Sequence, residues 1–129
     1  MNGKFLLDTN IVIALFSGDT AVQDKVASAN EIIVPAIVLG ELYFGARKSS
    51  RVQENLDCIN NFAASCAILS CDSRTAWEYG LIKNQLREKG HPIPENDIWI
   101  AALARQYKLI LVTRDKHFDE VEDIELQNW

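Results

Sequence analysis

Residues 4–16 have the sequence KFLLDTNIVIALF. The apolar run Phe5–Leu7 is short, stops at Asp8 and is followed at once by a second apolar pattern. In this second pattern, apolar residues recur three and four positions apart, which predicts a helix over Thr9–Phe16. The stretch therefore predicts a buried strand, an aspartate at the carboxyl end of that strand, and a helix that leads away from it.

The same alternation of short apolar runs and helical patterns continues along the chain. Apolar runs predict further strands at Glu31–Val34, Ala67–Ser70, Leu109–Val112 and Ile124–Leu126. Helical patterns predict helices at Thr20–Ser28, Pro35–Lys48, Ser49–Ala64, Ser73–Lys89 and Asn96–Tyr107, with a short helical turn before the last strand. Pro35 suits the first position of its helix, and Gly90 suits a C-cap.

The predicted strands are apolar without a polar alternate, which is typical of strands that are buried on both faces. Strands that alternate with helices indicate a parallel sheet. We therefore expect an α/β fold with a central parallel β-sheet flanked by helices on both faces, in one domain over residues 1–129. In such sheets, sites form outside the carboxyl ends of the strands.

The net charge is −5. An acidic total argues against broad, charge-driven binding of nucleic acid. It does not exclude a nuclease, because acids around bound metal ions lose most of their repulsion toward phosphate. The three cysteines form no CxxC or Cys/His pattern, which disfavours a disulfide framework or zinc site and favours a cytoplasmic protein. We expect no membrane span and no signal peptide, because the apolar runs are too short.

Three aspartates are expected at the edge of the sheet where such folds place their chemistry. Asp8 directly follows the first strand, Asp115 comes shortly after the Leu109–Val112 strand, and Asp97 lies in the first turn of the helix before that strand. Each also has an ordinary structural interpretation. Asp8 could be an N-cap, Asp97 could favour the positive end of its helix, and Asp115 could be a turn residue.

Glu41 is harder to explain by structure alone. Its helical neighbours include Ile37, Val38 and Phe44, so it lies on or beside the face that should pack against the sheet. No lysine or arginine lies one turn away, and burying an isolated charge costs many kcal/mol. We therefore expect Glu41 to find partners at a functional site.

Four carboxylates that converge on one edge would repel one another and raise each other's pKa values. A divalent cation relieves that repulsion, and Mg²⁺ and Mn²⁺ prefer oxygen ligands. We expect His91, in a proline-rich loop, and His117, in a polar turn, to face solvent. The predicted site therefore lacks a histidine base, so that hydrolysis would rely on a metal-activated water.

Five stretches of the chain resemble the PIN-domain family, and most closely its VapC-like toxins, the ribonuclease partners of bacterial toxin–antitoxin pairs. They are LLDTNIVIAL (6–15), PAIVLGELYFGARKS (35–49), PENDIWIAALA (94–104), LILVTRDKHF (109–118) and LQNW (126–129). The stretches occur in the family's order and at its spacing over nearly the whole chain. The resemblance implies a PIN fold and metal-dependent endoribonuclease activity.

The resemblance also implies roles for the acids. Asp8, Glu41, Asp97 and Asp115 match the family's acidic positions. Asp8, Asp97 and Asp115 would be ligands of Mg²⁺, for which Mn²⁺ could substitute, and Glu41 would be a ligand or would position the attacking water. Cleavage would leave a 5′-phosphate and a 3′-hydroxyl.

Five residues near the acids are expected to support them. Thr9 and Asn10 match the family's DTN turn, Asn96 precedes the third acid, and Thr113 would orient a carboxylate or a metal-bound water. Roles as local caps explain the two threonines and Asn96 equally well. Asp119 lies one helical turn after the fourth acid and could share or replace its role.

Contacts to substrate phosphates would have to come from local basic residues, because the total charge is acidic. The candidates are Arg47, Lys48, Arg51, Arg114 and Lys116. Each could equally be solvated surface charge. The resemblance suggests structured RNA as substrate, with transfer RNA the leading candidate.

The resemblance also suggests a homodimer and a small antitoxin that places a basic side chain among the acids. We expect the antitoxin to contact the apolar helix faces in Ile11–Phe16 and Ala36–Phe44.

Other interpretations stay open at this point. An enzyme with a nucleophilic aspartate of the haloacid-dehalogenase type needs a second aspartate where this chain has Asn10. A PIN-like domain that has become a catalytically silent binding or scaffold module has usually lost the acids, whereas all four are present here. A nuclease that acts on DNA would need the same site.

Overall fold

The computed structural model describes residues 3–129 and contains a five-stranded sheet in the order β3-β2-β1-β4-β5. The strands are β1 (Lys4–Leu7), β2 (Glu31–Pro35), β3 (Ala67–Leu69), β4 (Ile110–Val112) and β5 (Glu125–Gln127). The helices are α1 (Thr9–Phe16), α2 (Thr20–Ser28), α3 (Ala36–Lys48), α4 (Val52–Ala64), α5 (Ser73–Lys89), α6 (Glu95–Tyr107) and the 3₁₀ helix η1 (Lys116–Glu120). Within the described part of the chain, no helix combines the length and apolar character needed to cross a membrane.

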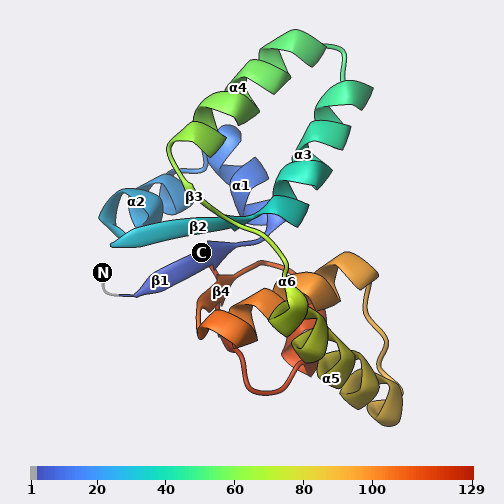
Figure 1. The fold of residues 1–129 in the computed structure, drawn as a ribbon. Helices are drawn as coiled ribbons and strands as arrows, with labels where there is room; N and C mark the ends of the chain where they lie inside the picture. Colours follow the sequence, from blue (N-terminus) through green and yellow to red (C-terminus); the bar gives the residue numbers. More distant parts are fainter. Residues whose placement is uncertain (1–2) are drawn as a thin grey trace.

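All four strand pairings are parallel, which confirms the predicted fold class. From β1 to β3 the strands advance in one direction, and right-handed crossovers then place α1–α4 on one side of the sheet. The chain next returns to the free edge of β1, opposite β2, and forms β4 there. The helices α5 and α6 therefore cover the other face of the sheet (Figure 1). The direction therefore reverses between β1 and β4, and parallel sheets of this kind place their binding crevice outside the carboxyl ends of two such strands.

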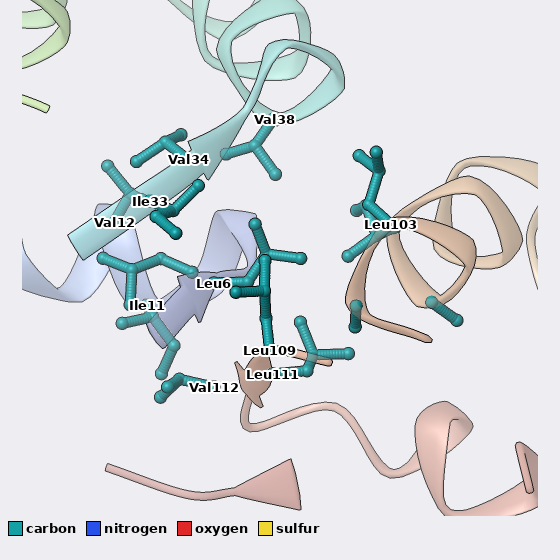
Figure 2. Close-up of a cluster of buried hydrophobic side chains, with 14 of the residues drawn as sticks. Leu6, Ile11, Val12, Ile33, Val34, Val38, Leu103, Leu109, Leu111 and Val112 are labelled. Carbon is teal, nitrogen blue, oxygen red and sulfur yellow. The ribbon is translucent and has the colours of Figure 1, made fainter. Parts of the chain in front are cut away.

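The core extends over both faces of the sheet. Leu6 of β1 and Leu111 of β4 are fully buried, as are Val12 of α1 and Leu103 of α6. Figure 2 shows Val12 and Leu103 at opposite sides of the strand residues, with Leu6 between them. Burying side chains of this kind contributes about 1.5–3 kcal/mol each, so the apolar strand residues stabilise the packing of both helical layers.

Two predicted boundaries were wrong. Pro35 ends β2, where it pairs with Leu69, and does not begin α3. The proline ring fixes the φ of Pro35 but leaves its ψ free, and a ψ of 141° keeps Pro35 extended. The helix predicted from Ser49 begins at Val52, because Ser49 is extended and its hydroxyl donates to the Ala46 carbonyl at the end of α3.

The other predicted boundaries agree with the structure to within one residue. Gly90 ends α5 with a φ of 71°, as expected of a left-handed C-cap.

The last residues of the chain pack against β1 and against the turn after β4. The Trp129 ring lies 5.1 Å from the Phe5 ring, centroid to centroid, and Trp129 is buried. The backbone amide of Thr113 donates to the Gln127 carbonyl at 3.0 Å. This last segment therefore holds the turn after β4 against the sheet.

Candidate active site

The fold brings the four predicted acids together at the crevice between β1 and β4. Asp8 caps α1 directly after β1, and Asp115 caps η1 after β4. Glu41 comes from α3 and Asp97 from the first turn of α6. Asp8 lies within electrostatic reach of Glu41 and Asp115, and Asp97 lies within reach of Asp8 and Asp115. These acids lie far apart in the sequence, and the fold brings them close together.

Asp8 is the most enclosed of the four, with 4% of its surface exposed. Its Oδ1 accepts from the Thr9 amide at 2.8 Å, and its Oδ2 accepts from the Thr113 hydroxyl at 2.8 Å and from Asn10 Nδ2 at 3.2 Å. Burial raises the pKa of Asp8 above its usual value, while these hydrogen bonds act against the rise. Asp8 is thus both a helix cap and the centre of the acidic group.

Thr113 and Asn10 connect the turns after β1 and β4. The buried Thr113 hydroxyl accepts from the Asp115 amide at 3.0 Å, and Asn10 Oδ1 accepts from the Arg114 amide at 3.1 Å. Asn10 Nδ2 also lies 3.4 Å from Thr113 Oγ1. These contacts set the position of Asp115 relative to Asp8.

Glu41 finds two of the partners expected for it. The Thr9 hydroxyl donates to its Oε2 at 2.7 Å, and Asn96 Nδ2 donates to its Oε1 at 3.1 Å. Glu41 is half-buried on α3, next to the buried Leu42. The two neighbours come from α1 and α6, so Glu41 joins elements from both sides of the crevice.

Asp97 carries the largest electrostatic perturbation of the site. Its pKa is raised to about 6, first by burial and then by the charges of Asp8 and Asp115. The hydrogen bond with His117 partly counteracts the rise. A carboxyl group in this environment gains from a nearby cation, because the cation offsets the repulsion of the other acids.

His117 faces solvent, as expected, but its ring lies beside two of the acids, so the expectation of a site without a histidine was wrong. Its side chain is half-exposed, but Nδ1 lies 3.2 Å from Asp97 Oδ2 and 3.0 Å from Asp115 Oδ1. The cause is the 3₁₀ turn: Asp115 Oδ1 accepts from the His117 amide at 2.9 Å, which folds the histidine back toward the acids. The spacing Asp115-x-His117 was the only sequence signal for this contact.

These three side chains form a compact set of potential metal ligands. One oxygen each from Asp97 and Asp115 and a nitrogen of His117 all lie within 4.8 Å of one another. Carboxylate and imidazole donors suit a divalent cation, so the residues present fit the metal that the sequence implies. Asp119 lies outside this set among residues 3–129; it is exposed and lines a neighbouring hollow of about 280 Å³.

An apolar cavity of about 390 Å³ lies between α1, α3 and α4 and reaches the site at Glu41. Ile13, Phe16 and Ile59 are among its lining residues. Ile13 is 51% exposed and Phe16 is 36% exposed, although both are large and apolar. The cavity therefore joins an uncovered apolar surface to the acidic group.

Arg114 already has partners within the chain. Its Nη2 lies 2.8 Å from Asp19 Oδ2, and its Nε donates to the Trp129 carbonyl at 2.9 Å. The hydrogen bond from Arg114 lowers the pKa of Asp19. Arg114 thus ties α2 to the C-terminus, and its predicted contact with phosphate stays a prediction.

The other basic candidates are exposed, in two places. Lys116 begins η1 beside Asp115. Arg47 and Lys48 end α3, about 10 Å along the helix from Glu41, and Arg51 follows them and pairs with Glu54 at 3.6 Å. Lys116 and Arg114 are the two basic candidates adjacent in sequence to Asp115. Of these two, Arg114 already pairs with Asp19 and Trp129, whereas the contacts described above include none for Lys116.

The fold and this geometry define a class: a parallel α/β protein with an acidic site at the carboxyl ends of its central strands. The PIN domain family matches residues 5–124. A protein named ribonuclease VapC2 from Haemophilus influenzae is 36% identical, over 98% of each chain. One named tRNA(fMet)-specific endonuclease VapC from Shigella flexneri is 32% identical, again over 98% of each chain.

A solved structure agrees with these matches. The crystal structure of VapBC2 from Rickettsia felis, bound to a DNA fragment from their promoter, contains a chain similar to this one with a TM-score of 0.90 and 27% identity. The match covers 100% of this chain and 99% of that chain. The protein therefore belongs to the PIN-domain family, among its VapC-like ribonucleases.

Proposed function

We propose that this protein is a Mg²⁺-dependent endoribonuclease that cleaves structured RNA, with transfer RNA as the substrate class, and that it is the toxin of a toxin–antitoxin pair. The observation that carries the nuclease proposal is the convergence of Asp8, Glu41, Asp97 and Asp115 at one crevice. Glu41 and Asp97 come from helices and the other two from turns after strands, so local structure does not require the four to meet.

The chain's own residues would hold the cation and the reacting groups. Asp8, Asp97 and Asp115 would hold Mg²⁺, and Glu41, fixed by Thr9 and Asn96, would hold or orient the attacking water. When bound, Mg²⁺ would supply positive charge to a phosphate oxygen and lower the pKa of a coordinated water. Asp8 can serve as a ligand while it accepts hydrogen bonds, because each carboxylate oxygen has more than one lone pair.

Transfer RNA is proposed on the strength of the Shigella flexneri relative, whose name specifies tRNA(fMet) as its substrate. Phosphates next to the cleaved bond would contact Lys116, and more distant ones would contact Arg47, Lys48 and Arg51 at the end of α3. Such contacts orient the RNA without reading its sequence.

An antitoxin partner is proposed because the similar Rickettsia felis structure contains VapBC2. The apolar cavity between α1, α3 and α4 would receive an apolar segment of that partner. Glu41 and Glu54 also line the cavity, so a basic side chain on the same segment would meet opposite charge. We also propose a homodimer, which static light scattering of the purified protein tests.

The nuclease test uses purified protein with total transfer RNA, with single-stranded DNA of similar length in parallel. We expect RNA cleavage with Mg²⁺ or Mn²⁺, none with EDTA, and loss of at least about 100-fold in Asp97→Asn. Asp24→Asn, which removes an exposed acid on α2, should cleave like the parent protein. Cleavage that persists in EDTA would refute the metal-dependent mechanism, and a preference for DNA would refute the substrate class.

The toxin role needs a separate test in cells. Induced expression should arrest growth, Asp97→Asn should not, and co-expression of the adjacent small open reading frame should restore growth. Unimpaired growth with the active protein would refute the toxin role and leave the ribonuclease proposal standing.

A further inference from the structure

We propose that His117 is itself a ligand of the divalent cation, through Nδ1, and that this nitrogen makes the site prefer Mn²⁺ to Mg²⁺ more than an all-carboxylate site would. The inference rests on the metal site of the proposed function. It adds a ligand that was not expected from the sequence, and it predicts which metal binds more tightly.

The spacing of the three donor atoms supports a shared ion. His117 Nδ1 lies 3.2 Å from Asp97 Oδ2 and 3.0 Å from Asp115 Oδ1. Two ligands at right angles around an octahedral ion, each about 2.1 Å from the metal, are about 3 Å apart. The nitrogen therefore lies at a distance from both carboxylates that suits two ligands of one octahedral ion.

The backbone holds His117 in this place. Asp115 caps η1 through the 2.9 Å bond from the His117 amide, and the Asp115 amide in turn donates to Thr113. The Thr113 hydroxyl donates a hydrogen bond to Asp8, so Asp115 and Thr113 link His117 to the centre of the acidic group.

The exposure of His117 also suits a ligand. Half of its side chain is open to solvent, whereas 14% of the Asp97 side chain and 33% of the Asp115 side chain are exposed. The histidine therefore lies at the outer side of the group, which leaves room there for water or a substrate phosphate on the same ion.

The nature of the donor predicts the metal preference. Mg²⁺ is bound almost entirely by oxygen, whereas imidazole nitrogen suits first-row transition metals and binds them more strongly than it binds Mg²⁺. Loss of the imidazole should therefore weaken Mn²⁺ binding more than Mg²⁺ binding. If His117 were only a positioning residue that donates a hydrogen bond to the carboxylates, its loss would weaken the binding of both ions to a similar extent.

The test is electron paramagnetic resonance of the full-length protein loaded with Mn²⁺. Pulsed measurements detect the ¹⁴N nucleus of a coordinated imidazole. We expect a ¹⁴N coupling in the parent protein and in His91→Gln, which changes the exposed histidine of the other loop, and no coupling in His117→Gln. Mn²⁺ affinity should fall at least about tenfold in His117→Gln, and Mg²⁺ affinity, from competition with Mn²⁺, by a smaller factor.

A second variant protects the test against a folding defect. His117→Asp replaces the nitrogen by a carboxylate oxygen, and it should bind Mg²⁺ more tightly relative to Mn²⁺ than the parent protein does. Circular dichroism verifies the fold of each variant.

The outcomes separate this inference from the proposed function. Mn²⁺ that binds the parent protein, depends on Asp97 and shows no ¹⁴N coupling overturns the role of His117 and leaves the metal site intact. Mn²⁺ binding that is absent, or unchanged in Asp97→Asn, overturns the metal site and with it this inference.

Discussion

The hydroxyl of Thr113 donates a 2.8 Å hydrogen bond to Oδ2 of Asp8, although 105 residues separate the two in the chain. Both groups are buried. The bond joins the turn after β4 to the turn after β1, and the Asp115 amide, which donates to Thr113, is held in the same arrangement. Thr113 therefore determines how far apart the first and last acids of the site lie.

Replacing Thr113 by valine should be costly, because the buried Asp8 carboxylate would lose a donor and keep its charge. We expect Thr113→Val to lower the free energy of unfolding by about 1–3 kcal/mol and to reduce RNA cleavage. Thr113→Ser keeps the hydroxyl and should retain most of both. Urea unfolding at pH 7 and a cleavage assay measure the two effects; equal stability of the valine and serine variants would contradict the role given to the hydroxyl.

The raised pKa of Asp97 predicts a stability that falls as the pH rises. Its pKa is about 6 in the folded protein and 3.8 in its ordinary state, so the folded protein binds more protons between these values. The free energy of unfolding of the metal-free protein should thus decrease from about pH 4 to pH 6. A shift of one pKa unit corresponds to about 1.4 kcal/mol, and solvent screening reduces the total to about 1–2 kcal/mol.

Asp97→Asn removes this contribution. In EDTA the variant should be more stable than the parent protein at pH 7.5, and the difference should shrink at pH 5. Urea unfolding at both pH values measures it, and Asp24→Asn controls for the loss of one negative charge. If the variant is less stable than the parent protein at pH 7.5, burial and the charges of Asp8 and Asp115 do not destabilise the charged form of Asp97.

Asp115 should be the fourth acid of the site, and Asp119 should not. Only Asp115 belongs to the compact group with Asp97 and His117 within residues 3–129. We expect Asp115→Asn to lower RNA cleavage about 10–100-fold or more, and Asp119→Asn to cleave nearly as fast as the parent protein. Cleavage rates at saturating Mg²⁺ compare the two variants, and an equal loss in both would assign them a shared role.

Arg114 should act mainly through structure. Its guanidinium bridges Asp19 and the Trp129 carbonyl, which a lysine cannot reproduce because it lacks the planar pair of donors. We expect Arg114→Lys to lower Tm by a few degrees, nearly as much as Arg114→Gln does. Arg47→Gln, at an exposed position on α3, should leave Tm unchanged. If Arg114→Lys keeps the parent Tm while Arg114→Gln loses RNA affinity, charge toward phosphate is the main role of Arg114.

Much of the fold was predictable because its signals are local. The run Phe5–Leu7 and the helical spacing after it predicted β1 and α1 with little error. Boundaries failed at Pro35 and Ser49, where a backbone torsion and a serine-to-carbonyl hydrogen bond decide between extended and helical conformation. Whether such a residue is extended or helical depends on one or two dihedral angles, and hydrophobic periodicity in the sequence carries no information about them.

The sequence by itself determined the α/β class and the order of the elements, because hydrophobic periodicity is a property of short segments. It also predicted four acids, whose roles stay predictions. Only the tertiary structure decided which groups touch. Glu41 meets Thr9 across 32 residues, and His117 meets Asp97 across 20. The first contact arises because β1 and β2 lie side by side, so that α1 and α3 begin next to each other. The second arises because the 3₁₀ turn after Asp115 folds His117 back toward α6.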